Sequence, residues 1–147
     1  MCGIAGYINF SENFVKRFDY HKNLAKEFCK TLTPRGPDAG GISILEHAVF
    51  AHSRLAVIDI AGGAQPMCRT ISGYDFVITY NGELYNTKEL RSTLEQFGYN
   101  FTSQSDTEVL LYSYIHYGTE CAKHLNGIYA FCIWDSMRQR AFLCRDH

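Results

Sequence analysis

The second residue of the chain is a cysteine, and its position offers a chemistry that an internal cysteine lacks. The chain opens Met1-Cys2-Gly3-Ile4-Ala5-Gly6, and the small side chain at position 2 permits an aminopeptidase to remove Met1. Cys2 would then carry a thiol and a free α-amine, whose pKa is about 7.7–8.0. Such an amine can act as the base that activates its own nucleophile. The alternative is that Cys2 is a small buried hydrophobe, as many cysteines are.

A cysteine that attacks an amide also needs hydrogen-bond donors for the oxyanion that forms. Asn81-Gly82 follows the apolar segment Asp75–Tyr80 and offers two neutral donors, the side-chain amide of Asn81 and the backbone N–H of Gly82. Donors of this kind contribute roughly 3–4 kcal/mol each in acyl-transfer enzymes. The other interpretation is a simple β-turn, which the Asn-Gly pair favours.

Three charged residues are candidates for holding a charged substrate. Arg54 interrupts an apolar run, where it either faces solvent or binds a carboxylate through two parallel hydrogen bonds. Asp106 follows the predicted helix cap Ser105, where it either complements the helix dipole or holds an ammonium group. Glu83, next to the Asn-Gly pair, could hold the same ammonium group.

Two further motifs have ordinary structural interpretations. His52 is interpreted as a core histidine rather than a base, because an α-amine at Cys2 makes a second base unnecessary. Arg35-Gly36-Pro37-Asp38 is interpreted as a rigid structural turn.

Composition excludes several classes of protein. The chain has 147 residues, which predicts one domain. Its net charge is −1 and it has no basic run, so we expect no nucleic-acid partner. It also lacks an apolar stretch of about 18 residues and the basic start of a signal peptide, so we expect no membrane partner and a cytoplasmic location.

The six cysteines show no spacing typical of a metal site. There is no C-x-x-C pair and no Cys/His cluster, so zinc binding is not predicted. In a reducing compartment we expect free thiols. Cys29, Cys132 and Cys144 lie in apolar runs and are predicted to pack in the core.

Apolar spacing predicts an α+β fold with a largely antiparallel sheet covered by helices. Two helices have predicted caps: one has an apolar stripe of Leu90, Leu94 and Phe97 with Asn86 and Glu89 at its start, and the other has a Ser105/Glu108 capping box. The last strand would be an edge strand unless the chain continues. The predicted helices include Val15–Leu32 and Asp106–Tyr117; the predicted strands are Gly3–Phe10, Gly41–Glu46, Ala48–Ile60 broken near Arg54, Asp75–Tyr80 ending in a turn at Asn81-Gly82, Gly127–Asp135 and Arg140–Arg145.

Seven motifs in order resemble those of a known family, the glutaminase domain of class II glutamine amidotransferases, and specifically its asparagine synthetase branch. The resemblance covers nearly all 147 residues. Each motif alone is weak, but the ordered set is specific. The motifs are Met1-Cys2-Gly3-Ile4-Ala5-Gly6, Arg35-Gly36-Pro37-Asp38, His52-Ser53-Arg54-Leu55, Gln65-Pro66-Met67, Tyr80-Asn81-Gly82-Glu83-Leu84-Tyr85-Asn86, Ser105-Asp106-Thr107-Glu108 and Arg145-Asp146-His147.

The resemblance implies an N-terminal nucleophile hydrolase fold, in which two antiparallel sheets lie between helices in four αββα layers. It implies hydrolysis of L-glutamine to glutamate and ammonia, without a metal or organic cofactor. It also implies a role for each matching residue. Cys2 is the nucleophile, Asn81 and Gly82 form the oxyanion hole, Arg54 binds the α-carboxylate, the backbone of Leu55, Ala56, Val57 and Ile58 lines the pocket, and Asp106 and Glu83 receive the α-ammonium group.

The resemblance further implies that residues 1–147 are one glutaminase domain that continues some tens of residues further. A C-terminal synthetase domain, which uses ATP and Mg²⁺ to convert aspartate to asparagine, is expected outside these residues as a partner, and a homodimer is allowed. Alternatives are a paralogue that delivers ammonia to a sugar or peptide, a non-catalytic glutamine-binding module, and a thiol sensor. The sensor would have the lowered pKa at a cysteine other than Cys2.

Overall fold

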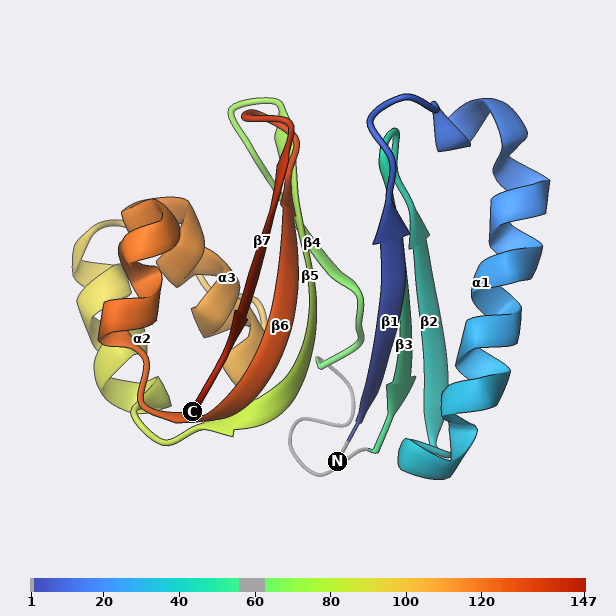
Figure 1. Ribbon diagram of the computed structural model, residues 1–147. Helices are drawn as coiled ribbons and strands as arrows, with labels where there is room; N and C mark the ends of the chain where they lie inside the picture. Colours follow the sequence, from blue (N-terminus) through green and yellow to red (C-terminus); the bar gives the residue numbers. More distant parts are fainter. Residues whose placement is uncertain (1, 56–62) are drawn as a thin grey trace.

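The computed structural model describes residues 2–55 and 63–147, and it arranges them in four layers (Figure 1). One outer layer is helix α1, the other contains α2 and α3, and two antiparallel sheets lie between them. The elements, in chain order with 3₁₀ turns as η, are β1 (Gly3–Ile8), η1 (Phe14–Arg17), α1 (Phe18–Leu32), η2 (Thr33–Arg35), β2 (Ala39–Ile44), β3 (Ala48–Arg54), β4 (Met67–Ile71), β5 (Tyr74–Leu84), α2 (Thr87–Gln96), α3 (Asp106–Tyr117), η3 (Gly118–His124), β6 (Gly127–Asp135) and β7 (Arg140–Arg145).

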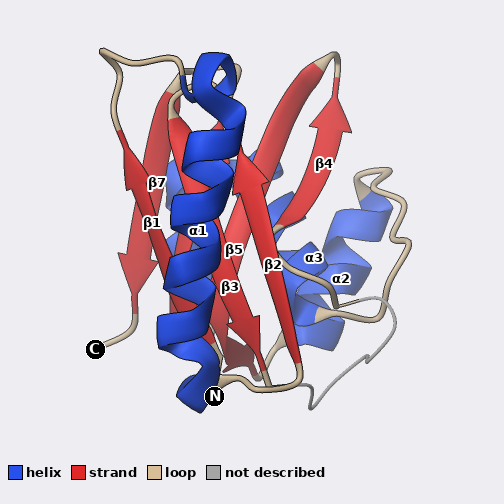
Figure 2. Ribbon diagram, turned by 90° about the vertical axis from the view of Figure 1, so that its right-hand side faces the viewer, coloured by secondary structure: helices blue, strands red, loops and turns tan. Residues whose placement is uncertain are grey.

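The first sheet has the strand order β1-β3-β2, and α1 covers its outer face (Figure 2). Phe14, Ala25 and Val49 form the buried core between helix and sheet. The helix predicted over Val15–Leu32 is present from Phe18, and the 3₁₀ turn η1 precedes it. The side chain of Asn13 caps η1 by accepting a hydrogen bond from the backbone of Val15.

The second sheet has the order β4-β5-β6-β7, with α3 packed on its outer face. A separate apolar cluster lies between the two sheets and joins them: Ala48 and Phe50 from β3 pack with Val77, Cys132 and Trp134 from β5 and β6. The predicted four-layer αββα architecture is therefore confirmed. Cys132 lies in this core, while Cys29 and Cys144 are only partly buried, and all six cysteines are free.

The predicted turn at Asn81-Gly82 is wrong. β5 runs straight through both residues, and Asn81 pairs with Ala130 while Gly82 pairs with Tyr129. An Asn-Gly pair favours a hairpin turn locally. Here β6 pairs with β5 as far as Leu84, so the pair continues the strand instead. The sequence reading also missed β4, a short edge strand whose only buried side chain is that of Met67.

Two predicted cap interactions are also wrong. Asn86 precedes α2 but does not cap it, because its side-chain amide donates to the carbonyl of His124 and its oxygen accepts from the backbone of Asn126. Ser105 does cap α3 through the N–H of Thr107, but Glu108 does not bond back to Ser105. The boundaries predicted for α3, β6 and β7 are confirmed. The strand predicted over Ala48–Ile60 was expected to break near Arg54, and β3 ends at that residue. Residues 56–60 of the predicted strand lie outside the described residues.

Candidate active site

Cys2 lies at the end of β1, beside the end of β3. Antiparallel pairing of Gly3 with Ser53 brings Cys2 level with Arg54, the last residue of β3. Its Sγ atom is 3.4 Å from the backbone nitrogen of Leu55 and 3.7 Å from its carbonyl oxygen. The guanidinium Nε of Arg35 donates to the carbonyl of Cys2 at 3.1 Å. Leu55 therefore contacts the side chain of the nucleophile candidate, and Arg35 holds its backbone.

The Arg-Gly-Pro-Asp segment packs closely against the end of β3. A Cβ atom at Gly36 would lie 2.2 Å from the carbonyl oxygen of Ser53, so only glycine fits there. The N–H of Asp38 donates to the carbonyl of Arg54 at 3.0 Å. The turn therefore carries Arg35 to Cys2 and supports the backbone of Arg54.

His52 connects the two sheets next to the site. Its Nε2 atom donates to the carbonyl of Tyr80 at 3.2 Å, and its side chain is fully buried. Burial lowers the pKa of His52 to about 4, against the opposing effect of the bond to Tyr80. His52 is thus a neutral core histidine, as predicted. Because Asn81 follows Tyr80, this bond also places the oxyanion-hole candidates relative to β3.

Gly82 permits an unusually close approach between β5 and β6. A Cβ atom at this position would lie 2.3 Å from the carbonyl oxygen of Ile128 and 2.7 Å from the Cα atom of Tyr129. Contacts that short are not tolerated, so any side chain would push the strands apart. Glycine is required here for space, and not for the turn that the sequence indicated.

Asp106 is the first residue of α3 and is hydrogen-bonded to β5. Its Oδ2 atom accepts from the hydroxyl of Tyr80 at 2.9 Å and from the backbone N–H of Leu84 at 3.2 Å. Burial, reinforced by the negative charge of Asp106, raises the pKa of Tyr80 far above its ordinary value. Tyr80 therefore stays protonated and donates to this carboxylate.

Gln65 adds a second connection between β5 and α3. Its Oε1 atom accepts from the backbone N–H of Tyr80 at 2.6 Å, and its Nε2 atom donates to the hydroxyl of Thr107 at 3.2 Å. The sequence offered a Gln-Pro-Met motif here but no role for the glutamine. A polar side chain in an irregular segment has no periodic pattern from which a contact could be predicted.

The predicted site residues that the structure describes lie around one cavity of about 240 Å³. Ala56, Val57 and Ile58 lie outside the described residues. The cavity also has lining residues to which the sequence analysis assigned no site role, among them Gln65, Tyr80, Tyr85, Thr107 and Ile128. The predicted residues in the lining are Cys2, Arg54, Leu55, Asn81, Gly82, Glu83 and Asp106.

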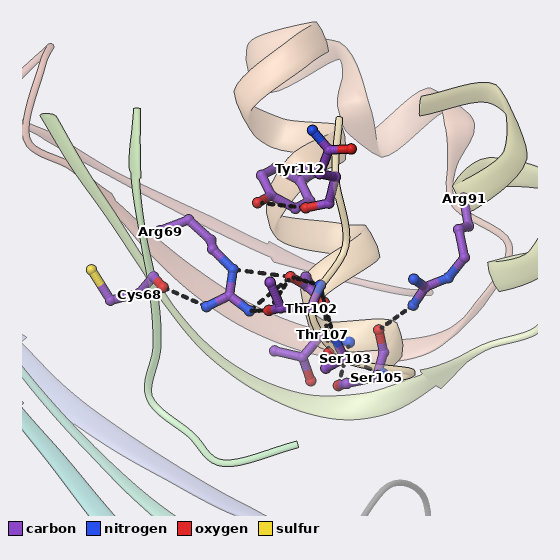
Figure 3. Close-up of polar contacts among 10 residues, drawn as sticks. Cys68, Arg69, Arg91, Thr102, Ser103, Ser105, Thr107 and Tyr112 are labelled. Carbon is purple, nitrogen blue, oxygen red and sulfur yellow. Dashed lines mark hydrogen bonds and ion pairs between the residues drawn. The ribbon is translucent and has the colours of Figure 1, made fainter. Parts of the chain in front are cut away.

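A buried carboxylate supports the helix end from which Asp106 projects. Glu108 is fully buried and accepts hydrogen bonds from the backbone and hydroxyl groups of Thr102 and Ser103. Arg69 donates to it from Nε and Nη2, at 3.0 and 2.7 Å, and Figure 3 shows Arg69 meeting Thr102 at this point. Burial alone would raise the pKa of Glu108, but these hydrogen bonds, first among them that of the Ser103 hydroxyl, lower it to about 2.

Within residues 2–55 and 63–147, no three His, Cys, Asp or Glu side chains gather in a way that could hold a metal ion. In the same part of the chain, no helix is both long and apolar enough to cross a bilayer.

Comparison with known proteins places this geometry in a family. The sequence model of the glutamine amidotransferase domain matches residues 1–147. Asparagine synthetase [glutamine-hydrolyzing] 3 of Bacillus subtilis is 47% identical over 99% of this chain and 23% of its own length. Asparagine synthetase B [glutamine-hydrolyzing] of Escherichia coli is 34% identical over all of this chain and 25% of its own length. The chain thus spans about a quarter of these relatives.

Solved structures share the fold. The allosteric regulatory enzyme of purine biosynthesis aligns with a TM-score of 0.57 and 26% identity, over 71% of this chain and 24% of that one. Glutamine phosphoribosylpyrophosphate amidotransferase from B. subtilis aligns with a TM-score of 0.52 and 24% identity, over 63% of this chain and 22% of that one, which shows the fold alone. The two-sheet architecture is that of the N-terminal nucleophile hydrolases. The relatives named above are glutamine-hydrolysing asparagine synthetases. The chain belongs to the glutamine amidotransferase domain family.

Proposed function

We propose that this domain hydrolyses L-glutamine to glutamate and ammonia with Cys2 as the nucleophile. One observation carries the proposal: Cys2, Arg54, Asn81-Gly82 and Asp106 come from separate segments of the chain and line one cavity. Their chemical types supply a thiol, a carboxylate-binding cation, an oxyanion hole and an ammonium-binding anion. Convergence of these four functions in one concave site is the pattern expected of an amide-hydrolysing centre.

The charges in the described lining suit a free amino acid. Arg54 would bind the α-carboxylate, for which a guanidinium offers two parallel donors. Asp106 and Glu83 would receive the α-ammonium group. The backbone of Leu55, with that of Ala56–Ile58, would line the cavity near the sulfur. A zwitterion held in this way would direct its side-chain amide toward Cys2.

Hydrolysis would proceed in two halves once Met1 is removed. The α-amine of Cys2 takes the thiol proton, and the sulfur attacks the side-chain amide carbon of glutamine. Asn81 and the N–H of Gly82 hold the oxyanion, the C–N bond breaks, and the protonated amine gives its proton to the leaving ammonia. Water, deprotonated by the same amine, then attacks the thioester, and the C–S bond breaks. The amine returns the proton to the sulfur, and glutamate leaves.

The names of the relatives support the proposal that the ammonia is used to form asparagine. A synthetase domain that uses ATP and Mg²⁺ to convert aspartate to asparagine would be the partner of this domain, while the glutaminase chemistry itself would require no cofactor. A cytoplasmic location, and a homodimer as the assembly, fit this role. Delivery of ammonia to a sugar or peptide is the alternative, and glutamine-dependent product formation by the whole protein distinguishes the acceptors.

The direct test combines mass spectrometry of the N-terminus with an assay of glutamine hydrolysis. We expect Met1 to be absent from the active protein, and glutamate and ammonia to form in equal amounts. A protein that lacks Met1, is folded and binds glutamine without turning it over would instead be the non-catalytic binding module.

A further inference from the structure

Four residues in the wall of the cavity form a hydrogen-bonded clasp that joins β5 to the start of α3. The clasp consists of Gln65, Tyr80, Asp106 and Thr107. Tyr80 donates its hydroxyl to Oδ2 of Asp106 at 2.9 Å. Gln65 accepts from the backbone of Tyr80 at 2.6 Å and donates to Thr107 at 3.2 Å. The clasp thus connects the residue before Asn81 to the helix turn that carries Asp106.

The clasp restricts how the carboxylate of Asp106 can turn. The torsion that rotates a carboxylate has broad minima, so an unrestrained Asp side chain samples many orientations. Here two donors from β5, the Tyr80 hydroxyl and the Leu84 N–H, both meet the same oxygen, Oδ2. Two donors at one oxygen fix the plane of the carboxylate with respect to β5 and hence to the oxyanion-hole candidates.

We propose that Tyr80 is a positioning residue for substrate selection, aiming the Asp106 carboxylate at the α-ammonium group of an amino-acid substrate. The inference rests on the glutamine hydrolysis proposed above and adds how the site would favour an α-amino acid over a simple amide. Tyr80 is suited to this task because its side chain is only 2% exposed, so water does not compete for the hydroxyl. Its raised pKa keeps the proton in place throughout the neutral range.

The test compares two substrates in the complete protein as the cell makes it. One is L-glutamine, and the other is 4-carbamoylbutanoate, which is glutamine without its α-amine. We expect Tyr80→Phe to raise the KM for L-glutamine about tenfold with kcat little changed, as loss of a hydrogen bond to a charged group allows. The kcat/KM for 4-carbamoylbutanoate should stay within about twofold of the wild-type value, because that compound has no ammonium group for Asp106 to bind.

Tyr114→Phe is the matched control. Tyr114 also donates its hydroxyl to a carboxylate at 2.9 Å, that of buried Asp135, but it does not line the cavity. This variant should alter stability without changing the selectivity between the two substrates. In an Asp106→Asn background, Tyr80→Phe should have little further effect on the KM for L-glutamine.

Two results would overturn the proposal: an unchanged KM for L-glutamine in Tyr80→Phe, or an equal loss of activity toward both substrates. Binding to the Cys2→Ala variant separates this idea from the proposed function, because dissociation constants for the two compounds need no turnover. If the variant binds L-glutamine more tightly than 4-carbamoylbutanoate, and Tyr80→Phe removes that preference, the inference holds even where hydrolysis is not found. If the preference is absent or survives Tyr80→Phe, Tyr80 does not select the substrate.

Discussion

The sulfur of Cys2 lies 3.4 Å from the backbone nitrogen of Leu55, although 52 residues separate them in the chain. The contact follows from the antiparallel pairing of β1 with β3, which brings the first described residues beside the end of β3. It places the nucleophile candidate next to Arg54, the proposed carboxylate-binding residue. One strand pair therefore brings together the proposed nucleophile and the proposed carboxylate-binding residue.

Replacing Cys2 should abolish glutamine hydrolysis. We expect Cys2→Ala to lower kcat by at least about 10³-fold, because in the proposed mechanism the Cys2 sulfur is the attacking group. Alanine at position 2 still permits removal of Met1, so the N-terminus stays comparable. Cys68→Ala is the control, because Cys68 is an exposed thiol on β4. Wild-type turnover by Cys2→Ala would contradict the mechanism.

Removing the side-chain amide of Asn81 should slow the chemical step more than it weakens binding. If Asn81 is an oxyanion-hole donor, as proposed, we expect Asn81→Ala to lower kcat by about 10²–10³-fold with a small change in KM. Asn23→Ala, at an exposed position on α1, should leave both constants unchanged. A large rise in KM with normal kcat would assign Asn81 to ground-state binding instead.

Adding one methyl group at Gly82 should disturb both stability and activity. Because the added Cβ would meet the backbone of Ile128 at 2.3 Å, we expect Gly82→Ala to lower the free energy of unfolding by about 1–3 kcal/mol. Gly40→Ala is a matched control in β2, since its nearest neighbour would be an ordinary 3.8 Å away. Urea unfolding measures both, and equal stability in the two variants would refute the close approach.

The Glu108 carboxylate should make the stability of the protein depend on acid pH. Because its folded pKa is lowered from 4.5 to about 2, its contribution is complete above pH 4.5 and is lost as the pH falls toward 2. The shift corresponds to roughly 3 kcal/mol. Urea unfolding at pH 7 and pH 3 should therefore show a smaller pH effect in Glu108→Gln than in the wild type.

A surface carboxylate provides the comparison for Glu108. Glu120 is exposed and pairs with exposed Lys123, so Glu120→Gln should keep the wild-type pH dependence. At pH 7, Glu108→Gln should be markedly destabilised, because Arg69 would lose its buried partner. Identical behaviour of the two variants would show that the buried network does not stabilise the start of α3.

Residue types and local order were enough to suggest the candidate chemistry, and the resemblance of seven ordered motifs to a known family then implied a role for each residue. Cys2 at the start, an arginine within an apolar run and an Asp beside a helix cap are local features, and each could be weighed from the printed sequence. The bounds of helix α3 were also predicted correctly, from the cap expected at Ser105. In the structure Gly118, with a φ of 61°, ends the helix. These signals are local because helix ends are governed by neighbouring residues.

Long-range packing decided what local patterns could not. Asn81-Gly82 is read locally as a turn, but pairing with β6 makes it part of a strand, and glycine is needed because Ile128 lies so close. Glu108 was predicted to be half of a capping box. In the structure it is bound by Thr102, Ser103 and Arg69, and Arg69 lies on β4, a strand that the sequence did not indicate. Tyr80 likewise meets Asp106 only because α3 packs on β5. Which side chains meet across the sheets depends on the register and on layer packing, and neither is encoded in any short segment.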